Sequence, residues 1–282
     1  MITCASPKSL DETRNQEIIA VMENVLRSGH YILGEQVSQF EIDFSKFIGQ
    51  NHGTGVNSGT DALILSLRAL GVGVGDEVIT VSHTALATVS AIVSCGATPV
   101  LVDIEEDYFS INPLEIELAI TSKTRAIIPV HIYGHAADMT LIMEIAKQYN
   151  LHVIEDCAQA TGAEYNGALV GSIGTLGCFS FYPTKNLGGI GDGGMVVTNN
   201  QALASSVVSL RQYGWDSQRN AMISGLNSRL DELQAAILNV KLKYLEQDNQ
   251  QRIRLAKLYD EQLSGTRVRT PKVRKDSKHV YH

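Results

Sequence analysis

The chain has 282 residues, of which 44% are hydrophobic and 19% are charged. This composition is typical of an ordinary soluble globular protein with a large core, and it excludes fibrous and disordered classes. The formal net charge of −7 disfavours nucleic-acid binding, because no basic stripe is available to neutralise phosphates. Only Arg267–Lys278 is locally basic, and we interpret this stretch as a solvated linker.

The cysteines and the N-terminal segment indicate the compartment. Cys4, Cys95, Cys157 and Cys178 form no close pair, which favours a reducing cytoplasm over a disulfide framework or a zinc site. Residues 1–11 lack the apolar core of a signal peptide. No apolar run approaches the ~20 residues that span a membrane. We therefore expect a cytoplasmic protein with no membrane or nucleic-acid partner.

Strand and helix signals alternate along most of the chain. Apolar β-branched runs predict strands at Glu77–Val81, Pro99–Asp103, Ala126–Val130, His152–Glu155, Cys178–Phe181 and Met195–Thr198. Helical spacing predicts helices at Ala85–Ser94, Pro113–Ile120, Met139–Tyr149, Leu230–Asp248 and Arg252–Leu263. This alternation predicts an α/β fold with a mostly parallel sheet sandwiched by helices.

The segment Asn57–Leu63 contains a turn that enters an amphipathic helix running to about Leu70. Ser58 or Gly59 would cap this helix, and Gly59 leaves room for a bound group to approach closely. Free N–H groups and the positive end of the helix dipole make such a turn suitable for a phosphate. A helix cap without a ligand is the alternative for this motif alone.

Asp156 follows the buried strand that ends near Glu155. The carboxyl end of a strand is where open α/β sheets bind ligands, and a buried carboxylate there needs a partner. That partner is either a basic side chain of the protein or a protonated ring nitrogen of a bound cofactor.

Lys185 follows an apolar strand through a turn that contains Pro183, and it precedes a glycine-rich loop. Partial burial would lower the pKa of its amine, and such a lysine can form a Schiff base. A solvated loop lysine is the ordinary alternative. The Gly188–Gly194 stretch matches G-x-G-x-x-G but leads into a strand instead of opening a helix, which argues against a dinucleotide site.

Two histidines, His131 and His135, bracket Ile132–Gly134 at a strand end. They do not share a helix face, and the glutamate of a metalloprotease motif does not follow His131. We expect loop or core histidines here and no metal ion.

The order and spacing of these motifs resemble those of fold-type I pyridoxal-phosphate enzymes. The residues within the motifs resemble those of one branch, the DegT–StrS family of sugar aminotransferases. The resemblance covers nearly the whole chain, through Gly29–Gly34, Phe40–Glu41, Gly75–Ile79, Glu155–Ala160, Ser180–Phe181, Lys185 and Gly225–Leu230.

The resemblance implies a role for each matched residue. Lys185 would hold pyridoxal 5'-phosphate covalently and relay the proton, Asp156 would pair with the pyridine nitrogen, and Gln159 would lie near the ring hydroxyl. The residues that would bind the phosphate are Gly59, Thr60 and Ser180, with Asn227 reaching it from the neighbouring subunit of a homodimer with shared active sites. Glutamate would donate the amine, and a nucleotide-linked keto-sugar would accept it. The sugar would be a dTDP-3-keto-6-deoxyhexose, for amino-sugar biosynthesis.

Two departures from the family accompany this resemblance. Ala85 stands where the family often places an aromatic over the cofactor ring, and His83 is our candidate for a replacement π face. Family members also continue past His279–His282 into a small C-terminal domain. We therefore expect a large domain at residues 1–250 with its N-terminal segment, and a linker helix with the start of a truncated small domain at 251–282. Residues from about Ser264 onward would be displaced for want of a strand partner.

Three other functions compete with that of an aminotransferase. A pyridoxamine-dependent sugar dehydratase would carry histidine in place of Lys185. A nicotinamide oxidoreductase would need the glycine loop to open a helix. A catalytically silent or regulatory cofactor-binding homologue remains the alternative from a different class.

Overall fold

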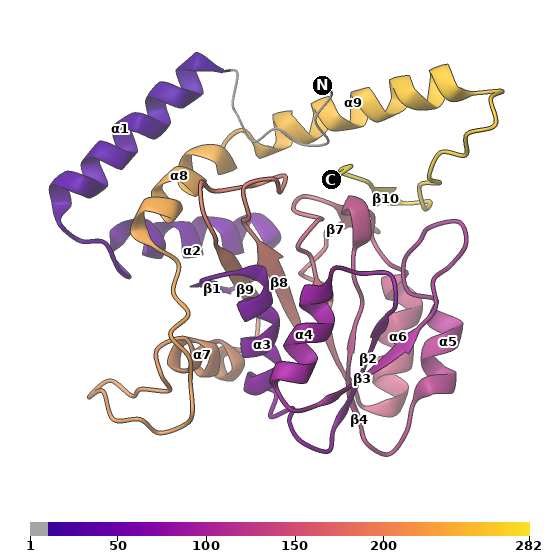
Figure 1. Ribbon diagram of the computed structural model, residues 1–282, viewed down its shortest axis with the longest axis horizontal. Helices are drawn as coiled ribbons and strands as arrows, with labels where there is room; N and C mark the ends of the chain where they lie inside the picture. The colour runs from indigo at the N-terminus through magenta and orange to yellow at the C-terminus, as the bar shows by residue number, and fades with distance from the viewer. Residues whose placement is uncertain (1–10) are drawn as a thin grey trace.

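A seven-stranded sheet forms the centre of the computed structural model, which describes residues 11–282 (Figure 1). Its strands lie in the order β1-β9-β8-β5-β4-β2-β3, and a second sheet has the order β10-β6-β7. The bounds are β1 His52–Val56, β2 Glu77–Val81, β3 Thr98–Val102, β4 Thr124–Ile128, β5 His152–Asp156, β6 Glu164–Tyr165, β7 Ala168–Leu169, β8 Leu176–Ser180, β9 Gly194–Thr198 and β10 Ser277–Lys278. In the large sheet only β9 runs against its neighbours, so the expected mostly parallel sheet is confirmed.

Helices cover both faces of this sheet (Figure 1). Their bounds are α1 Glu12–Ser28, α2 Glu35–Ile48, α3 Gly59–Ala69, α4 Leu86–Ser94, α5 Pro113–Ala119, α6 Met139–Tyr149, α7 Gln201–Leu210, α8 Glu232–Leu242 and α9 Leu245–Leu263, with a 3-10 turn at Ile132–Gly134. One apolar cluster joins α2, α5, α6 and α8 to the sheet, and a second joins α3, α4 and α7 to it. Successive strand residues alternate between the two, with Val153 in the first and Ile154 in the second.

The six strands expected from the sequence are all present, with shifts of one or two residues at their ends. The helix break is placed differently. The sequence predicted a gap after Asp248, whereas the structure ends α8 at Leu242 and starts α9 at Leu245. Helical spacing of apolar residues continues across Lys243 and Tyr244, so no local signal marks this break.

The segment after α9 packs back onto the large sheet's loops, so the expectation of a displaced segment without a strand partner is wrong. Ser277–Lys278 pairs antiparallel with Glu164–Tyr165, and the Val280 side chain is fully buried. The Val280 N–H donates to Gly134 O at 3.0 Å.

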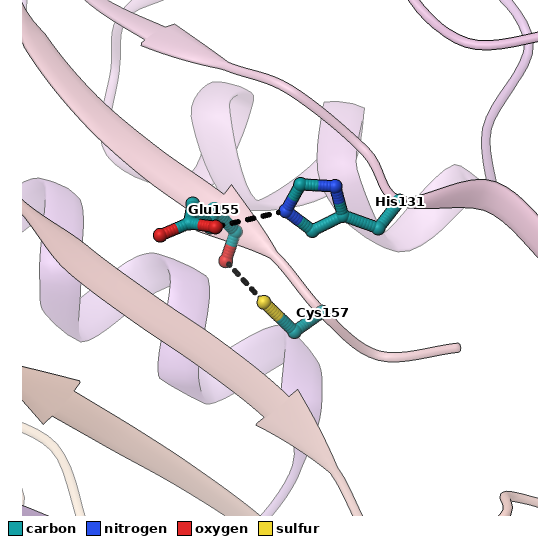
Figure 2. A group of neighbouring side chains, drawn as sticks. All are labelled: His131, Glu155 and Cys157. Atoms are coloured by element: carbon teal, nitrogen blue, oxygen red, sulfur yellow. Dashed lines mark hydrogen bonds and ion pairs between the residues drawn. The ribbon is translucent and has the colours of Figure 1, made fainter. Parts of the chain in front are cut away.

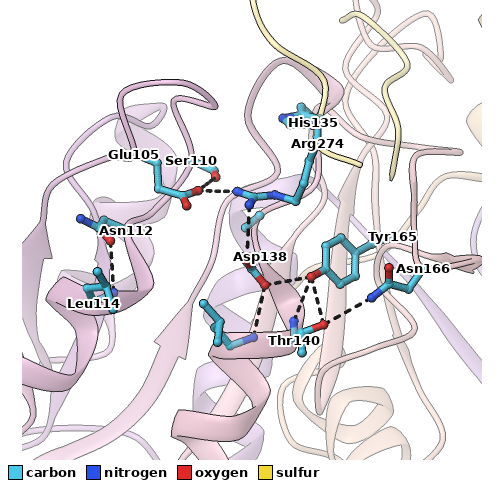
Figure 3. Close-up of polar contacts among 12 residues, drawn as sticks. Glu105, Ser110, Asn112, Leu114, His135, Asp138, Thr140, Tyr165, Asn166 and Arg274 are labelled. Carbon is cyan, nitrogen blue, oxygen red and sulfur yellow. Dashed lines mark hydrogen bonds and ion pairs between the residues drawn. The ribbon is translucent and has the colours of Figure 1, made fainter. Parts of the chain in front are cut away.

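Four basic side chains of this segment form ion pairs, so it is more than a linker, although Arg269 and Lys272 stay more than half exposed as expected for a solvated stretch. Figure 3 shows Arg274 between Glu105 and Asp138, and its backbone N–H donates to His135 Nε2 at 2.9 Å. Lys272 pairs with Asp107, and Lys278 pairs with Glu164 and Glu246. The acidic partners lie far away in the sequence, on loops, in β6 and in α9, so the local charge pattern could not indicate these ion pairs.

Two expectations lie partly beyond what the structure tests. The proposed boundary between residues 250 and 251 falls inside the continuous helix α9, and the division into domains stays a prediction. The expectation of no signal peptide rests on residues 1–11, of which 1–10 lie outside the described residues, as does Cys4. Cys95, Cys157 and Cys178 are free thiols. Within 11–282, every helix is too short or too polar to cross a bilayer.

A buried histidine in the C-terminal segment makes the stability of the protein depend on pH. His279 stacks on Tyr281 and on His135, and its Nδ1 accepts the N–H of Tyr281 at 3.0 Å. Burial lowers the pKa of His279 to about 3 and that of His135 to about 4. The unfolded chain, with histidine pKa values near ~6.5, therefore binds more protons than the folded chain below that pH.

We predict that the contribution of these buried neutral histidines to the free energy of unfolding is complete above pH ~6.5 and is lost as the pH drops toward ~4. His279→Phe keeps a ring in the stack but removes one titrating group, so its unfolding free energy should fall less steeply over this window. Urea unfolding at several pH values measures this, with His30→Phe at an exposed site as the control. An equally steep fall in His279→Phe would contradict the assignment.

Candidate active site

The carboxyl ends of the parallel strands converge on a cavity of about 250 Å³. Asp156 ends β5, Ser180 ends β8, and Ala85 and Ala87 follow β2. The expected site residues Gly59, Thr60, Asp156, Gln159, Ser180 and Lys185 all line this cavity. The structure thus brings six of the seven candidates together from three separate stretches of chain.

Asp156 is a buried carboxylate that faces the cavity. Its Oδ2 accepts the hydroxyl of Thr88 at 2.9 Å, and its Oδ1 accepts the N–H of Ala158 at 3.1 Å. Burial raises the pKa of Asp156, and the positive charge of Lys185 opposes that rise. Thr88 was missed by the sequence reasoning, since nothing local marks a threonine inside α4 as a partner for β5.

Lys185 lies in the turn after β8, where its N–H donates to Tyr182 O at 2.8 Å. Its side chain is half-buried, and burial lowers the pKa of its amine while Asp156 raises it. No hydrogen bond to its Nζ is recorded among residues 11–282. The expectation of a partly desolvated lysine is confirmed, so more of this amine is neutral at a given pH than for a solvated lysine.

The N-terminus of α3 forms one wall of the cavity. The Ser58 side chain caps the helix by accepting the N–H of Asp61 at 3.1 Å. The N–H groups of Gly59 and Thr60 precede the first intrahelical bonds, and the helix dipole is positive here. A Cβ at Gly59 would meet the Cβ of Ser180 at 2.7 Å, so only glycine allows α3 to approach β8 this closely. These donors and the Ser180 hydroxyl form a cradle suited to a phosphate.

Asn227 is the candidate that the structure places apart. Its side chain is exposed and does not line the cavity of its own chain. Its neighbour Ser228 is buried beside α3, donating to Asp61 Oδ2 at 2.7 Å and accepting the N–H of Asn57 at 3.1 Å. Asn227 therefore lies on the surface near the phosphate cradle, without entering it.

His83 does not line the cavity either. Its Nε2 lies 3.0 Å from the hydroxyl of Tyr133, and the two rings pack with centroids 5.6 Å apart. Ala85 and Ala87 line the wall where the sequence reasoning looked for an aromatic. The suggestion that His83 supplies a π face gains no support from this placement.

A buried cluster of His131, Glu155 and Cys157 lies directly beside Asp156 (Figure 2). His131 Nδ1 accepts the N–H of Ala137 at 3.1 Å, so its Nε2 carries the proton and donates to Glu155 at 3.0 Å. Both ring nitrogens are thus engaged. Burial and the neighbouring carboxylates raise the pKa of the Cys157 thiol, which keeps it protonated. These states oppose metal ligation, which needs a free imidazole nitrogen and a thiolate.

Glu155 acts as an anchor for the loop before β8. Its carboxylate accepts the N–H groups of Gly171, Ile173 and Gly174 at 2.8, 2.8 and 2.6 Å in addition to the proton of His131. This network fixes the end of β5 and so the position of Asp156. The expectation of core histidines is confirmed for His131, and the sequence reasoning missed the anchoring role of Glu155.

We predict that Glu155→Gln lowers the free energy of unfolding by about 1–3 kcal/mol, because an amide NH₂ would face buried N–H donors. His131 cannot compensate by changing tautomer, since its Nδ1 must accept the N–H of Ala137. Urea unfolding measures the change, and Glu117→Gln on an exposed helix face is the control. Equal stability of both variants would show that the network is dispensable.

Comparisons with known proteins agree with this geometry. Residues 12–282 match the DegT/DnrJ/EryC1/StrS aminotransferase family. The chain is 47% identical over 274 residues to the pleiotropic regulatory protein of Geobacillus stearothermophilus, covering 96% of this chain and 74% of that one. It is 49% identical over 282 residues to the dTDP-3-amino-3,6-dideoxy-alpha-D-galactopyranose transaminase of Aneurinibacillus thermoaerophilus, covering 100% and 78%.

Among solved structures, that of S. venezuelae DesV matches with a TM-score of 0.95 and 45% identity, covering 98% of this chain and 75% of that one. The family and the fold expected from the sequence are therefore confirmed. The chain belongs to the DegT/DnrJ/EryC1/StrS aminotransferase family, whose members depend on pyridoxal phosphate.

Proposed function

We propose that this chain is an aminotransferase that moves an amino group onto a nucleotide-linked keto-sugar, with pyridoxal phosphate held in the cavity described above. The observation that carries the proposal is the meeting of Asp156, Lys185 and the α3 phosphate cradle in one cavity. The chain's place in an aminotransferase family supports it.

The donor set of the cavity fits the cofactor. Asp156 is buried with a raised pKa and accepts two hydrogen bonds, neither of them from a cation. A protonated pyridine nitrogen would supply the positive partner that this carboxylate needs. The cradle of Gly59, Thr60 and Ser180 lies on the same cavity and would take the phosphate.

When bound, pyridoxal phosphate supplies an electron-withdrawing ring that makes a carbon next to the transferred nitrogen acidic. Lys185 would attach the cofactor and then carry a proton between substrate and cofactor carbons, which its lowered pKa favours near neutral pH. Asp156 would hold the ring nitrogen protonated, and Gln159 would lie beside the ring oxygen.

The proposed substrate class rests on the names of similar proteins. The Aneurinibacillus thermoaerophilus protein is named as a transaminase of a dTDP-linked 3-amino-6-deoxy sugar. Its 49% identity over the whole of this chain supports a dTDP-3-keto-6-deoxyhexose as the acceptor here. We propose glutamate as the amino donor, as the family resemblance implies.

A homodimer with shared sites is part of the proposal. Asn227 is exposed beside the cradle, where it can serve a neighbouring subunit. Large apolar side chains are exposed close by in sequence, at Met222 and Ile223, and also at Tyr182, which lines the cavity, and at Leu86 in α4. A second copy would cover such surface.

A regulatory, catalytically silent protein is the second candidate, because the Geobacillus stearothermophilus relative is named as a regulatory protein. The half-buried lysine facing Asp156 favours the enzyme. A silent binding protein needs the phosphate cradle but has no use for an amine of lowered pKa.

We predict that Lys185→Ala abolishes amine transfer while the chain stays folded, because it removes both the attachment point and a base worth ~10²–10⁴-fold. Borohydride treatment of the parent protein, followed by peptide mass spectrometry, should place the cofactor mass on Lys185. Lys257→Ala on the exposed face of α9 is the control and should transfer normally. A labelled peptide that lacks Lys185 would overturn the assignment.

Asp156→Asn should bind the cofactor but transfer slowly. A neutral amide cannot hold the ring nitrogen protonated, so the ring withdraws electrons less well. Single-turnover rates measured beside cofactor affinity separate these effects, with Asp43→Asn on an exposed helix face as the control. Parental rates in Asp156→Asn would show that Asp156 has no part in activating the cofactor.

A further inference from the structure

Tyr133 has a backbone conformation that is unusual for a residue with a side chain. Its φ of 57° and ψ of 8° lie in the left-handed region, and Gly134 follows with a φ of 90°. A Cβ makes this conformation costly, and such residues persist only where their surroundings hold them. The turn lies after β4, at the same sheet edge as the cofactor cavity, and its neighbour Ile132 lines that cavity.

Three contacts hold Tyr133 in this conformation. The hydroxyl is 3.0 Å from His83 Nε2, on the loop after β2. The carbonyl accepts the N–H of His282 at 2.8 Å. The N–H donates to Gln159 Oε1 at 2.6 Å. The side chain is therefore anchored on one side, and the backbone N–H is aimed at Gln159 on the other.

This contact decides the orientation of the Gln159 amide. Within the Gln159 carboxamide, only the oxygen can accept a hydrogen bond from an N–H group. The oxygen must therefore face Tyr133, and the NH₂ group must lie on the other side of the amide. Gln159 lines the cavity, and among residues 11–282 no acceptor for its Nε2 is recorded. The amide thus has one end fixed by Tyr133 and a donor left for a group inside the cavity.

We propose that Tyr133, anchored by His83, is a positioning residue that fixes the Gln159 amide with its NH₂ group directed at the ring oxygen of the bound cofactor. The inference rests on the proposed function, because it needs pyridoxal phosphate in this cavity. It assigns a use to the left-handed conformation of Tyr133 and to the His83–Tyr133 contact, although neither side chain lines the cavity.

The test compares two substitutions in the cofactor-loaded protein. Tyr133→Ala loses the side-chain contact with His83, but its Cβ still makes the left-handed backbone conformation unfavourable. The turn should therefore relax and move its N–H away from Gln159. Tyr133→Gly loses the same side chain but adopts the conformation freely, so the N–H should stay in place. If Tyr133 served only in packing, Tyr133→Gly should have the larger effect of the two, since glycine fills no more space than alanine.

The readout is the pKa at which the absorbance of the bound cofactor titrates. A donated hydrogen bond favours the anionic form of the ring oxygen, so losing it raises this pKa. We expect a rise of about one unit in Tyr133→Ala and less than half of it in Tyr133→Gly. Tyr149→Ala, in an ordinary exposed helical position, should leave the titration unchanged.

A double substitution shows whether Tyr133 acts through Gln159. In a Gln159→Leu background the pKa should already be raised, and adding Tyr133→Ala should change it no further. Equal pKa values in the parent and in Tyr133→Ala, or additive shifts in the double variant, would overturn the inference. Should Tyr133→Ala fail to fold, Tyr133→Phe, which loses only the hydroxyl contact with His83, must show a rise for the inference to stand.

The outcomes also separate this inference from the proposed function. A parent protein that binds no cofactor at Lys185 refutes both. A parent labelled at Lys185, with a titration insensitive to Tyr133→Ala, refutes the positioning role alone.

Discussion

The central physical constraint in this molecule is that a buried carboxylate, Asp156, requires a positively charged partner. Asp156 lies at the carboxyl end of a central parallel strand, where it is removed from water and faces a cavity. A threonine hydroxyl and a backbone N–H satisfy part of its hydrogen-bonding capacity, and neither brings a charge. Lys185 is the cation that acts on its pKa most strongly, and its own amine is made more basic by Asp156. A bound cofactor with a basic ring nitrogen would supply the positive partner of Asp156 and would leave the Lys185 amine free to react.

The rest of the fold keeps this pair in place. Glu155 points to the opposite face of β5 and anchors the loop before β8 through three backbone N–H groups. His131 ties the same carboxylate to the turn after β4, and that turn carries Tyr133. The C-terminal segment closes the arrangement from outside, with Arg274 held between Glu105 and Asp138 (Figure 3). The consecutive acids of β5 thus point to opposite faces: Glu155 anchors the loop before β8, and Asp156 faces the cavity.

The sequence predicted the features that follow from local pattern. Apolar runs located six strands, and an acid at a strand end and a lysine after a strand located two side chains that line the cavity, Asp156 and Lys185. It missed β1 because His52–Val56 is rich in glycine, although a Cβ at Gly53 would meet Glu41 O at 2.6 Å, so close packing against α2 requires the glycine. It also missed Thr88, Tyr133 and the ion pairs of Arg274, since each depends on contacts between residues far apart in the chain. Asn227 lies on the surface and outside the cavity of its own chain, so its expected role in a neighbouring subunit stays a prediction.

The most direct test of the central claim is a crystal structure of the protein loaded with pyridoxal phosphate. The account predicts that the ring nitrogen lies within about 3 Å of an Asp156 carboxylate oxygen. It also predicts that the phosphate contacts the N–H groups of Gly59 or Thr60 and the hydroxyl of Ser180, with Lys185 bonded to the cofactor. A cofactor bound with its ring nitrogen away from Asp156, or with its phosphate outside the α3 cradle, would contradict the account.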